Sequence, residues 1–82
     1  IRIVPNPLSG MLYLSYNLNQ AGRVQVALYD ITGRQVAGLL DRQLEPGRLE
    51  LRWDASRLAC GVYLVKVTAP GGVETQKLVI KR

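Results

Sequence analysis

The chain has 82 residues, of which 48% are hydrophobic and 21% are charged, so it can form the core of one small domain, residues 1–82, and has no room for a second. Its formal net charge of +5 comes from cations that are scattered between apolar residues, as on solvated strand faces, which argues against a nucleic-acid partner. With no His and one Cys, the sequence excludes an intramolecular disulfide, a thiolate metal site and the usual base for a cysteine nucleophile.

The longest apolar runs are only a few residues long, so we expect no membrane span. No stretch combines a basic start, an apolar run and a small-residue cleavage site, and the first residue is Ile1. We therefore expect a piece of a longer chain, which supplies any export signal.

Period-two alternation of apolar and polar residues recurs along the chain, whereas helical spacing is hard to find, and this pattern predicts an all-β domain. The first expected strand, 1–4, ends at Pro5-Asn6-Pro7, where two residues without amide protons favour a sheet edge. The next, 11–17, directs one set of side chains to the core, namely Leu12, Leu14 and Tyr16, and leaves Tyr13 and Ser15 outside.

The middle of the chain predicts a hairpin of strands at 23–30 and 34–41. Its first strand directs Val24, Val26 and Leu28 to the core. We expect Asp30 to accept a hydrogen bond from the backbone two residues further on, and Gly33 to adopt the left-handed conformation that a type I turn with a bulge requires.

The strand expected at 48–53 alternates strictly, which places Leu49, Leu51 and Trp53 in the core. Asp54 is expected to cap a single helical turn at 55–58. Cys60 is expected to be a half-buried small residue before the next strand.

The last two strands are expected to pair through a two-residue type I′ turn at Gly71-Gly72, which makes Pro70 and Val73 neighbours. On one face this register pairs Val65 with Leu78, Tyr63 with Ile80 and Val67 with Gln76. On the other it pairs Thr68 with Thr75, Lys66 with Lys77 and Leu64 with Val79, which leaves an apolar spot on the outer surface.

About seven short strands separated by Gly and Pro turns indicate an immunoglobulin-like β-sandwich of antiparallel strands. The Cys…Trp…Cys spacing of antibody domains is absent. An unpaired edge strand would permit dimers in a crystal.

The sequence offers no catalytic, metal or cofactor constellation, so we do not expect an enzyme. Its six carboxylates have plainer uses, with Asp30 and Asp54 as turn and helix caps. Pro70-Gly71-Gly72 precedes a strand rather than a helix, so it lacks the helix end that binds phosphate.

Four segments together resemble the type A C-terminal sorting domain of the Bacteroidetes type IX secretion system: VPNP (4–7), RVQVALYDITGR (23–34), LRWDASRLACGVYLVKV (51–67) and QKLVIKR (76–82). The related immunoglobulin-like domain of the flagellar hook-capping protein shares the middle motifs. The KLVIKR segment that closes the chain distinguishes the sorting domain.

The resemblance implies a non-catalytic domain attached to an N-terminal cargo, an enzyme or adhesin. The precursor would reach the periplasm and then pass the outer membrane to the cell surface or the medium. The implied partners are secretion-machinery proteins, namely an outer-membrane translocon and a sortase-like peptidase that can link the cargo to lipopolysaccharide. The matching positions are Pro5, Asn6 and Pro7 in the opening motif, and Gly61, Tyr63, Val65, Lys77, Leu78, Val79, Ile80, Lys81 and Arg82 in the last two strands.

The cations Lys66, Lys77, Lys81 and Arg82 fit either of two interpretations, an electrostatic approach to an acidic receptor or ordinary solvated side chains on an edge strand. Two other functions remain open. One is a general immunoglobulin-like adhesion or assembly module, as in hook capping. The other is an accessory carbohydrate-binding module of a glycosidase, with Tyr13 and Tyr29 as candidate aromatic contacts.

Overall fold

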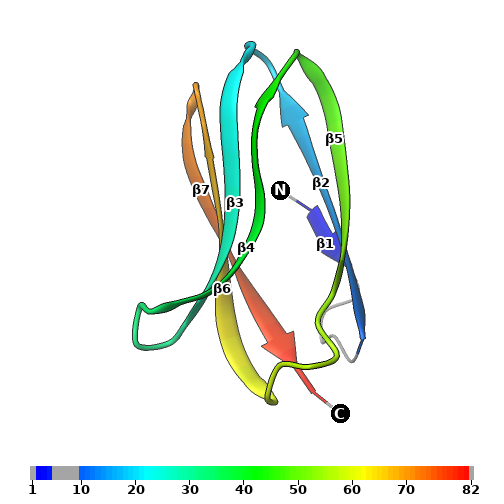
Figure 1. Ribbon diagram of the computed structural model, residues 1–82, viewed down its shortest axis with the longest axis vertical. Helices are drawn as coiled ribbons and strands as arrows, with labels where there is room; N and C mark the ends of the chain where they lie inside the picture. The colour runs from blue at the N-terminus through cyan, green and yellow to red at the C-terminus, as the bar shows by residue number, and fades with distance from the viewer. Residues whose placement is uncertain (1, 5–9, 82) are drawn as a thin grey trace.

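The computed structural model describes residues 2–4 and 10–81 of the chain (Figure 1). The regular elements in these ranges are strands, so the expected all-β class is confirmed. In chain order they are β1 (Arg2–Val4), β2 (Met11–Leu18), β3 (Gly22–Asp30), β4 (Gln35–Leu44), β5 (Gly47–Asp54), β6 (Gly61–Ala69) and β7 (Gly72–Ile80).

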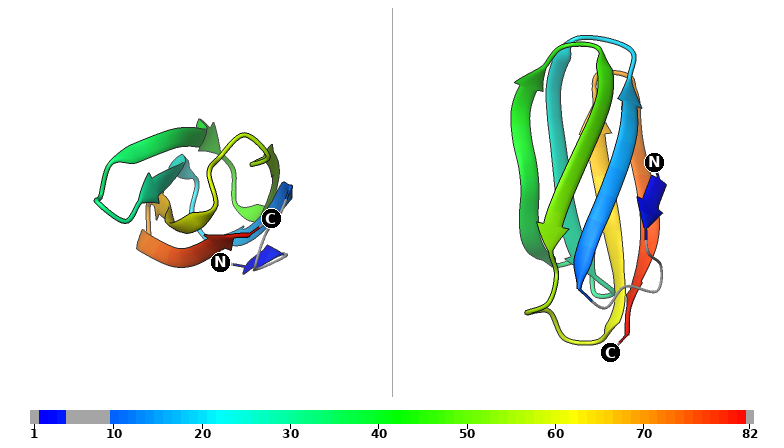
Figure 2. Two further views of the ribbon diagram at one scale, coloured as in Figure 1. Left: turned by 90° about the horizontal axis from the view of Figure 1, so that it is seen from below. Right: turned by 90° about the vertical axis from the view of Figure 1, so that its right-hand side faces the viewer.

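The strands form two antiparallel sheets that pack face to face (Figures 1 and 2). Sheet A has the order β1-β2-β5, and sheet B has the order β4-β3-β6-β7. β1 lies at an edge, as its flanking prolines predict. The chain crosses between the sheets after β2, β4 and β5, so neither sheet can form from one continuous segment.

The core between the sheets follows the alternation of the sequence. Most of the predicted inward residues of β2 and β3 are almost inaccessible, with exposed fractions of 0% for Leu12, Val24 and Leu28. Tyr16 is the exception, because it is only partly buried against the core. The inward residues of β5, among them Trp53, are partly buried and pack against this core. Fully burying one such aliphatic side chain contributes about 1.5–3 kcal/mol, so the alternation itself is the main reason for this fold.

The turn between β3 and β4 has the predicted chemistry. Asp30 Oδ1 accepts hydrogen bonds from the Thr32 amide (2.9 Å), the Arg34 amide (3.1 Å) and the Thr32 hydroxyl. Gly33 has a φ of 88°, a conformation that side chains with a Cβ rarely adopt. One carboxylate thus satisfies the amides that the turn leaves without strand partners.

Strand β4 departs from regular pairing in a way that the sequence analysis missed. Two register shifts occur opposite β3, one between Val26 and Ala27 and one between Leu28 and Tyr29. The β4 sequence contains adjacent apolar pairs, which a regular strand would send to opposite faces. The bulges allow both members of each pair to pack partly against the core, namely Val36, Ala37, Leu39 and Leu40.

The expected register of the last hairpin is wrong by two residues. Ala69 pairs with Gly72, so the turn residues are Pro70 and Gly71, and Val65 pairs with Gln76 instead of Leu78. A type I′ turn needs positive φ at both central positions, but Gly71 does not have it, whereas Gly72 does, at 140°. The proline ring fixes φ near −65°, which suits the first central position of an ordinary turn. Because the shift is even, every side chain keeps its expected face.

Two expectations about the β5–β6 connection also need correction. Residues 55–58 form a turn closed by the Leu58 amide on the Ala55 carbonyl (3.1 Å) rather than a helix, and Asp54 caps it through the Ser56 amide (2.9 Å). Cys60 is exposed instead of half-buried, because the connection runs over the surface before β6 begins.

Candidate functional site

The hairpin of β6 and β7 carries the residues that the sequence analysis selected, and the fold divides them between two faces. The inward-facing members are nearly inaccessible, with exposed fractions of 8% for Tyr63, 0% for Val65 and Leu78, and 1% for Ile80. These four residues pack in the core, so a partner protein cannot contact their side chains without unfolding the domain.

The remaining described candidates are accessible at the surface. Lys66 and Lys77 are exposed on the outward side of the hairpin, and Val79 is half-buried there. Gly61 and Lys81 are exposed at the start of β6 and just after β7. Pro5, Asn6, Pro7 and Arg82 lie outside the described residues.

Tyr63 has a specific structural partner. Its hydroxyl donates a 2.7 Å hydrogen bond to the carbonyl of Ala59, four residues upstream, and so fastens the β5–β6 connection to the strand that follows. A tyrosine near the start of the sixth strand, bonded back to upstream backbone, is typical of immunoglobulin-like sandwiches. Tyr63 was expected as a motif position, but its bond to Ala59 was not predicted, although a tyrosine near the start of the sixth strand is a usable signal for such a bond.

The outward side chains of β6 and β7 define a surface that we call the outer hairpin face. It consists of four cross-strand pairs: Val62 with Val79, Leu64 with Lys77, Lys66 with Thr75, and Thr68 with Val73. The expected apolar spot at Leu64 and Val79 is present in this face, although these two residues are not direct partners. Lys66 lies beside Tyr29 of β3, with its Nζ atom 5.8 Å from the ring centroid.

The apolar residues of the outer hairpin face are considerably exposed: Val62 by 39%, Leu64 by 38% and Val73 by 55%. Val62 and Val73 were not expected to be part of the apolar spot, because a period-two pattern does not show how exposed an outward side chain is. Val62 and Leu64 lie near each other at the start of β6, whereas Val73 lies at the turn end of the hairpin. Neighbouring exposed apolar groups are characteristic of interaction surfaces.

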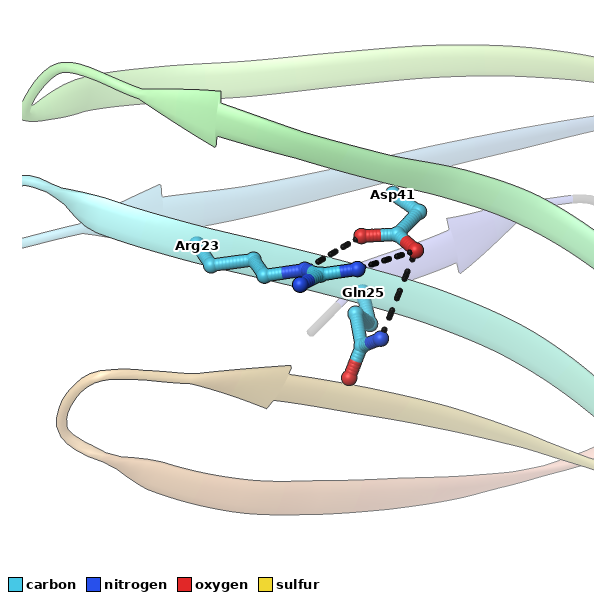
Figure 3. A network of polar contacts seen from close by, with 3 residues as sticks. All are labelled: Arg23, Gln25 and Asp41. Carbon is cyan, nitrogen blue, oxygen red and sulfur yellow. Dashed lines mark hydrogen bonds and ion pairs between the residues drawn. The ribbon is translucent and has the colours of Figure 1, made fainter.

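A second polar cluster lies on β3 and β4 (Figure 3). Arg23 donates two hydrogen bonds to Asp41, at 2.7 and 2.8 Å, and the Gln25 amide lies 3.5 Å from the same carboxylate. The hydrogen bonds from Arg23 hold the pKa of Asp41 below its ordinary value, and the same pairing raises the pKa of Arg23. The pair links β3 to β4 at the surface, where solvent screens both charges, because the two side chains are 67% and 50% exposed.

The two tyrosines proposed for sugar binding lie on different sheets. Tyr13 is 44% exposed and lines a hollow of about 600 Å³ on sheet A, together with Arg48, Glu50 and Arg52. Tyr29 lines a smaller hollow of about 270 Å³ on the outer side of sheet B. Because these surfaces face away from each other, the two rings cannot form one row of aromatic contacts.

The described residues also contain no group of three His, Cys, Asp or Glu side chains close enough to hold a metal ion. A search of the same residues finds no helix with the length and apolar character needed to cross a bilayer.

The folded chain is thus a small β domain of two antiparallel sheets, with a mixed apolar and cationic surface on its last hairpin. A comparison with curated proteins finds no match. The chain does match the secretion system C-terminal sorting domain family over residues 2–81, which is almost its whole length. It therefore belongs to this family, whose members act as sorting signals for type IX secretion and are in general non-catalytic.

Proposed function

We propose that residues 1–82 form one non-catalytic sorting domain that directs an N-terminally attached cargo, an enzyme or adhesin, through the type IX secretion system. The observation that carries this proposal is the family match over residues 2–81. The cargo would pass through the periplasm and across the outer membrane to the cell surface or the medium, and the partners would be the outer-membrane translocon and the sortase-like peptidase.

The fold supports separate structural and recognition roles for the buried and the exposed residues of the family motif. Tyr63, Val65, Leu78 and Ile80 hold the hairpin in the core, and the exposed Gly61, Lys66, Lys77 and Lys81 remain accessible to the machinery. β7 is an edge strand that pairs with β6 over nine residues without a register shift. Such an edge can be extended by a strand from a partner.

We propose further that the fold is an immunoglobulin-like sandwich. Two antiparallel sheets with the chain crossing repeatedly between them are compatible with this class. In the constant-type arrangement the fourth strand lies beside the fifth, whereas here β4 pairs with β3. The Tyr63 bond to the upstream backbone supports the assignment.

A reporter fusion tests the proposed function. A fluorescent protein with an export signal, joined to the N-terminal side of residues 1–82, is expressed in a type IX-competent host and in an isogenic strain that lacks the translocon. We expect the reporter at the surface or in the medium of the competent strain and in the periplasm of the other. Equal distribution in the two strains would contradict a sorting role and would favour a general adhesion or assembly module.

A further inference from the structure

We infer that the outer hairpin face, extended onto Tyr29 of β3, is the surface that the secretion machinery binds, and that its partner is a protein surface that combines carboxylates with apolar side chains. This inference rests on the proposed function, because it names the partner chemistry of the same hairpin. It adds positions that are not among the motif residues named for the sorting signal, namely Val62, Leu64, Val73 and Tyr29.

Exposed apolar side chains are concentrated on the outer hairpin face. Six large hydrophobic residues of the described chain are counted as exposed, and three of them, Val62, Leu64 and Val73, belong to the outer hairpin face. A fourth, Ile31, is 76% exposed in the turn after β3, the strand next to β6. On a solvated outer face the outward positions would normally carry polar residues, whereas these positions carry Val and Leu. A binding surface accounts for this choice.

The charged side chains of the outer hairpin face are positive. Both charged side chains of the outer hairpin face are lysines, Lys66 and Lys77, and the exposed Lys81 follows at the end of β7. A face with lysines among its apolar residues attracts a partner that combines carboxylates with apolar side chains, and this attraction speeds association and fixes orientation.

The outer face of sheet A provides the contrast. There Arg48 and Glu50 form an ion pair of 3.1 Å, with Arg52 two residues further along β5. Charges of both signs that pair within the sheet are typical of a solvated surface. Sheet B has such a pair as well, Arg23 with Asp41, so the contrast is limited to the outer hairpin face, where both charged side chains are lysines.

The geometry favours a protein over a lipid surface. The face is formed by two nine-residue strands, and its exposed apolar residues, Val62, Leu64 and Val73, are only 38–55% exposed, which is too little for deep insertion into a bilayer. A stable protein interface buries about 800 Å² on each side, so we expect the partner to cover Lys66, Thr75 and Tyr29 together with the apolar residues.

The test uses the reporter fusion with two variants of equal charge change. Lys66→Glu with Lys77→Glu reverses two charges on the outer hairpin face, and Arg48→Glu with Arg52→Glu makes the same change on the outer face of sheet A. We expect secretion to fall at least about tenfold in the first variant, because attraction becomes repulsion. The second variant should be secreted like the parent, and Lys66→Arg with Lys77→Arg should retain secretion.

The apolar half of the face is tested with Val62→Thr and Leu64→Thr together, against Tyr13→Thr on sheet A. Threonine keeps strand propensity, and circular dichroism melts of the purified chains establish that each variant is folded. A folded Val62→Thr, Leu64→Thr variant should be secreted poorly, and Tyr13→Thr should be secreted normally.

A photo-crosslinking residue at position 64 identifies the class of partner, with position 13 as the control. We expect a translocon-dependent adduct with a protein segment rich in carboxylates at position 64 only. Normal secretion of the folded charge-reversed and threonine variants, with the parent fusion still translocon-dependent, would overturn this inference and leave the sorting role intact. Charge-dependent binding of the purified chain to phosphatidylglycerol vesicles, without a protein adduct, would overturn it in favour of a membrane surface.

Discussion

At the residue scale, Tyr63 shows how a motif position can serve the fold rather than the partner. Its ring is buried and its hydroxyl bonds to the Ala59 carbonyl at 2.7 Å. We expect Tyr63→Phe to lower the free energy of unfolding by about 1 kcal/mol, because the hydrogen bond is lost and little packing changes. Urea denaturation measures this difference. Tyr13→Phe, at an exposed ring, should leave the midpoint unchanged, and equal midpoints for both variants would show that the Tyr63 bond contributes nothing.

The aspartates at positions 30 and 41 give the stability a pH dependence. Hydrogen bonds from the Thr32 hydroxyl to Asp30 and from Arg23 to Asp41 lower the pKa of both carboxyls in the folded state. The unfolded chain therefore binds more protons as the pH falls below about 3.9, so the contribution of both groups is complete above that pH and is lost below it. The thermal midpoint should decrease as pH is lowered from 5 toward about 2.

An asparagine variant separates the contribution of Asp41 from the protonation of the other carboxyls at low pH. Asp41→Asn should start with a lower midpoint at neutral pH and lose less of it on acidification. Glu45→Asn, at an exposed loop position, serves as the control and should follow the parent curve. An unchanged acid slope in Asp41→Asn would argue that the Arg23 pairing does not stabilise the fold.

At the element scale, the turn of the last hairpin distinguishes two neighbouring glycines. Gly72 has a φ of 140° and Gly71 does not have a positive φ, and neither would bring an added Cβ within 4 Å of another atom. We expect Gly72→Ala to cost about 1–2 kcal/mol through backbone strain alone. Gly71→Ala should be close to neutral or slightly stabilising. Chemical denaturation of the two variants measures both, and equal costs would favour a type I′ turn at Gly71-Gly72.

The β3–β4 hairpin shows which structural features the apolar and polar pattern of the sequence can and cannot predict. The existence of the β3–β4 hairpin and the chemistry of its turn follow from Asp30 and Gly33 alone. The two bulges do not, since Val36, Ala37, Leu39 and Leu40 break the alternation without indicating how the strand adjusts. The adjustment depends on the opposing strand, which fixes how many apolar groups the core can accept.

At the scale of the whole molecule, the last strand is both a core element and the proposed signal. A domain of 82 residues has a free energy of unfolding of about 4–12 kcal/mol. Leu78→Ala, at a side chain with no exposed surface, should cost about 2–5 kcal/mol, which is a large share of this stability. Lys77→Ala, one residue away on the outward face, should change stability by less than about 0.5 kcal/mol. Thermal denaturation compares the two, and similar losses would contradict the assignment of faces.

The difference between buried and exposed residues of β7 determines how secretion experiments on the last hairpin are interpreted. A truncation that removes Leu78 and Ile80 destroys the core together with any surface signal, so its failure to be secreted has two explanations. Substitutions at Lys66, Lys77, Val62 and Leu64 leave the buried side of both strands intact. They therefore separate recognition from folding.

The sequence by itself determined the all-β class, the inward and outward faces of β2, β3, β5, β6 and β7, and the turn at Asp30, because alternation and turn chemistry are local properties of the chain. Tertiary structure alone decided the register of the last hairpin, the bulges in β4 and the bond from Tyr63 to Ala59. It also decided which motif residues are accessible, with Tyr63, Val65, Leu78 and Ile80 inside and Lys66, Lys77 and Val79 outside the sandwich. The physical reason is that burial and pairing depend on the strands that pack opposite each residue, and these come from distant parts of the chain.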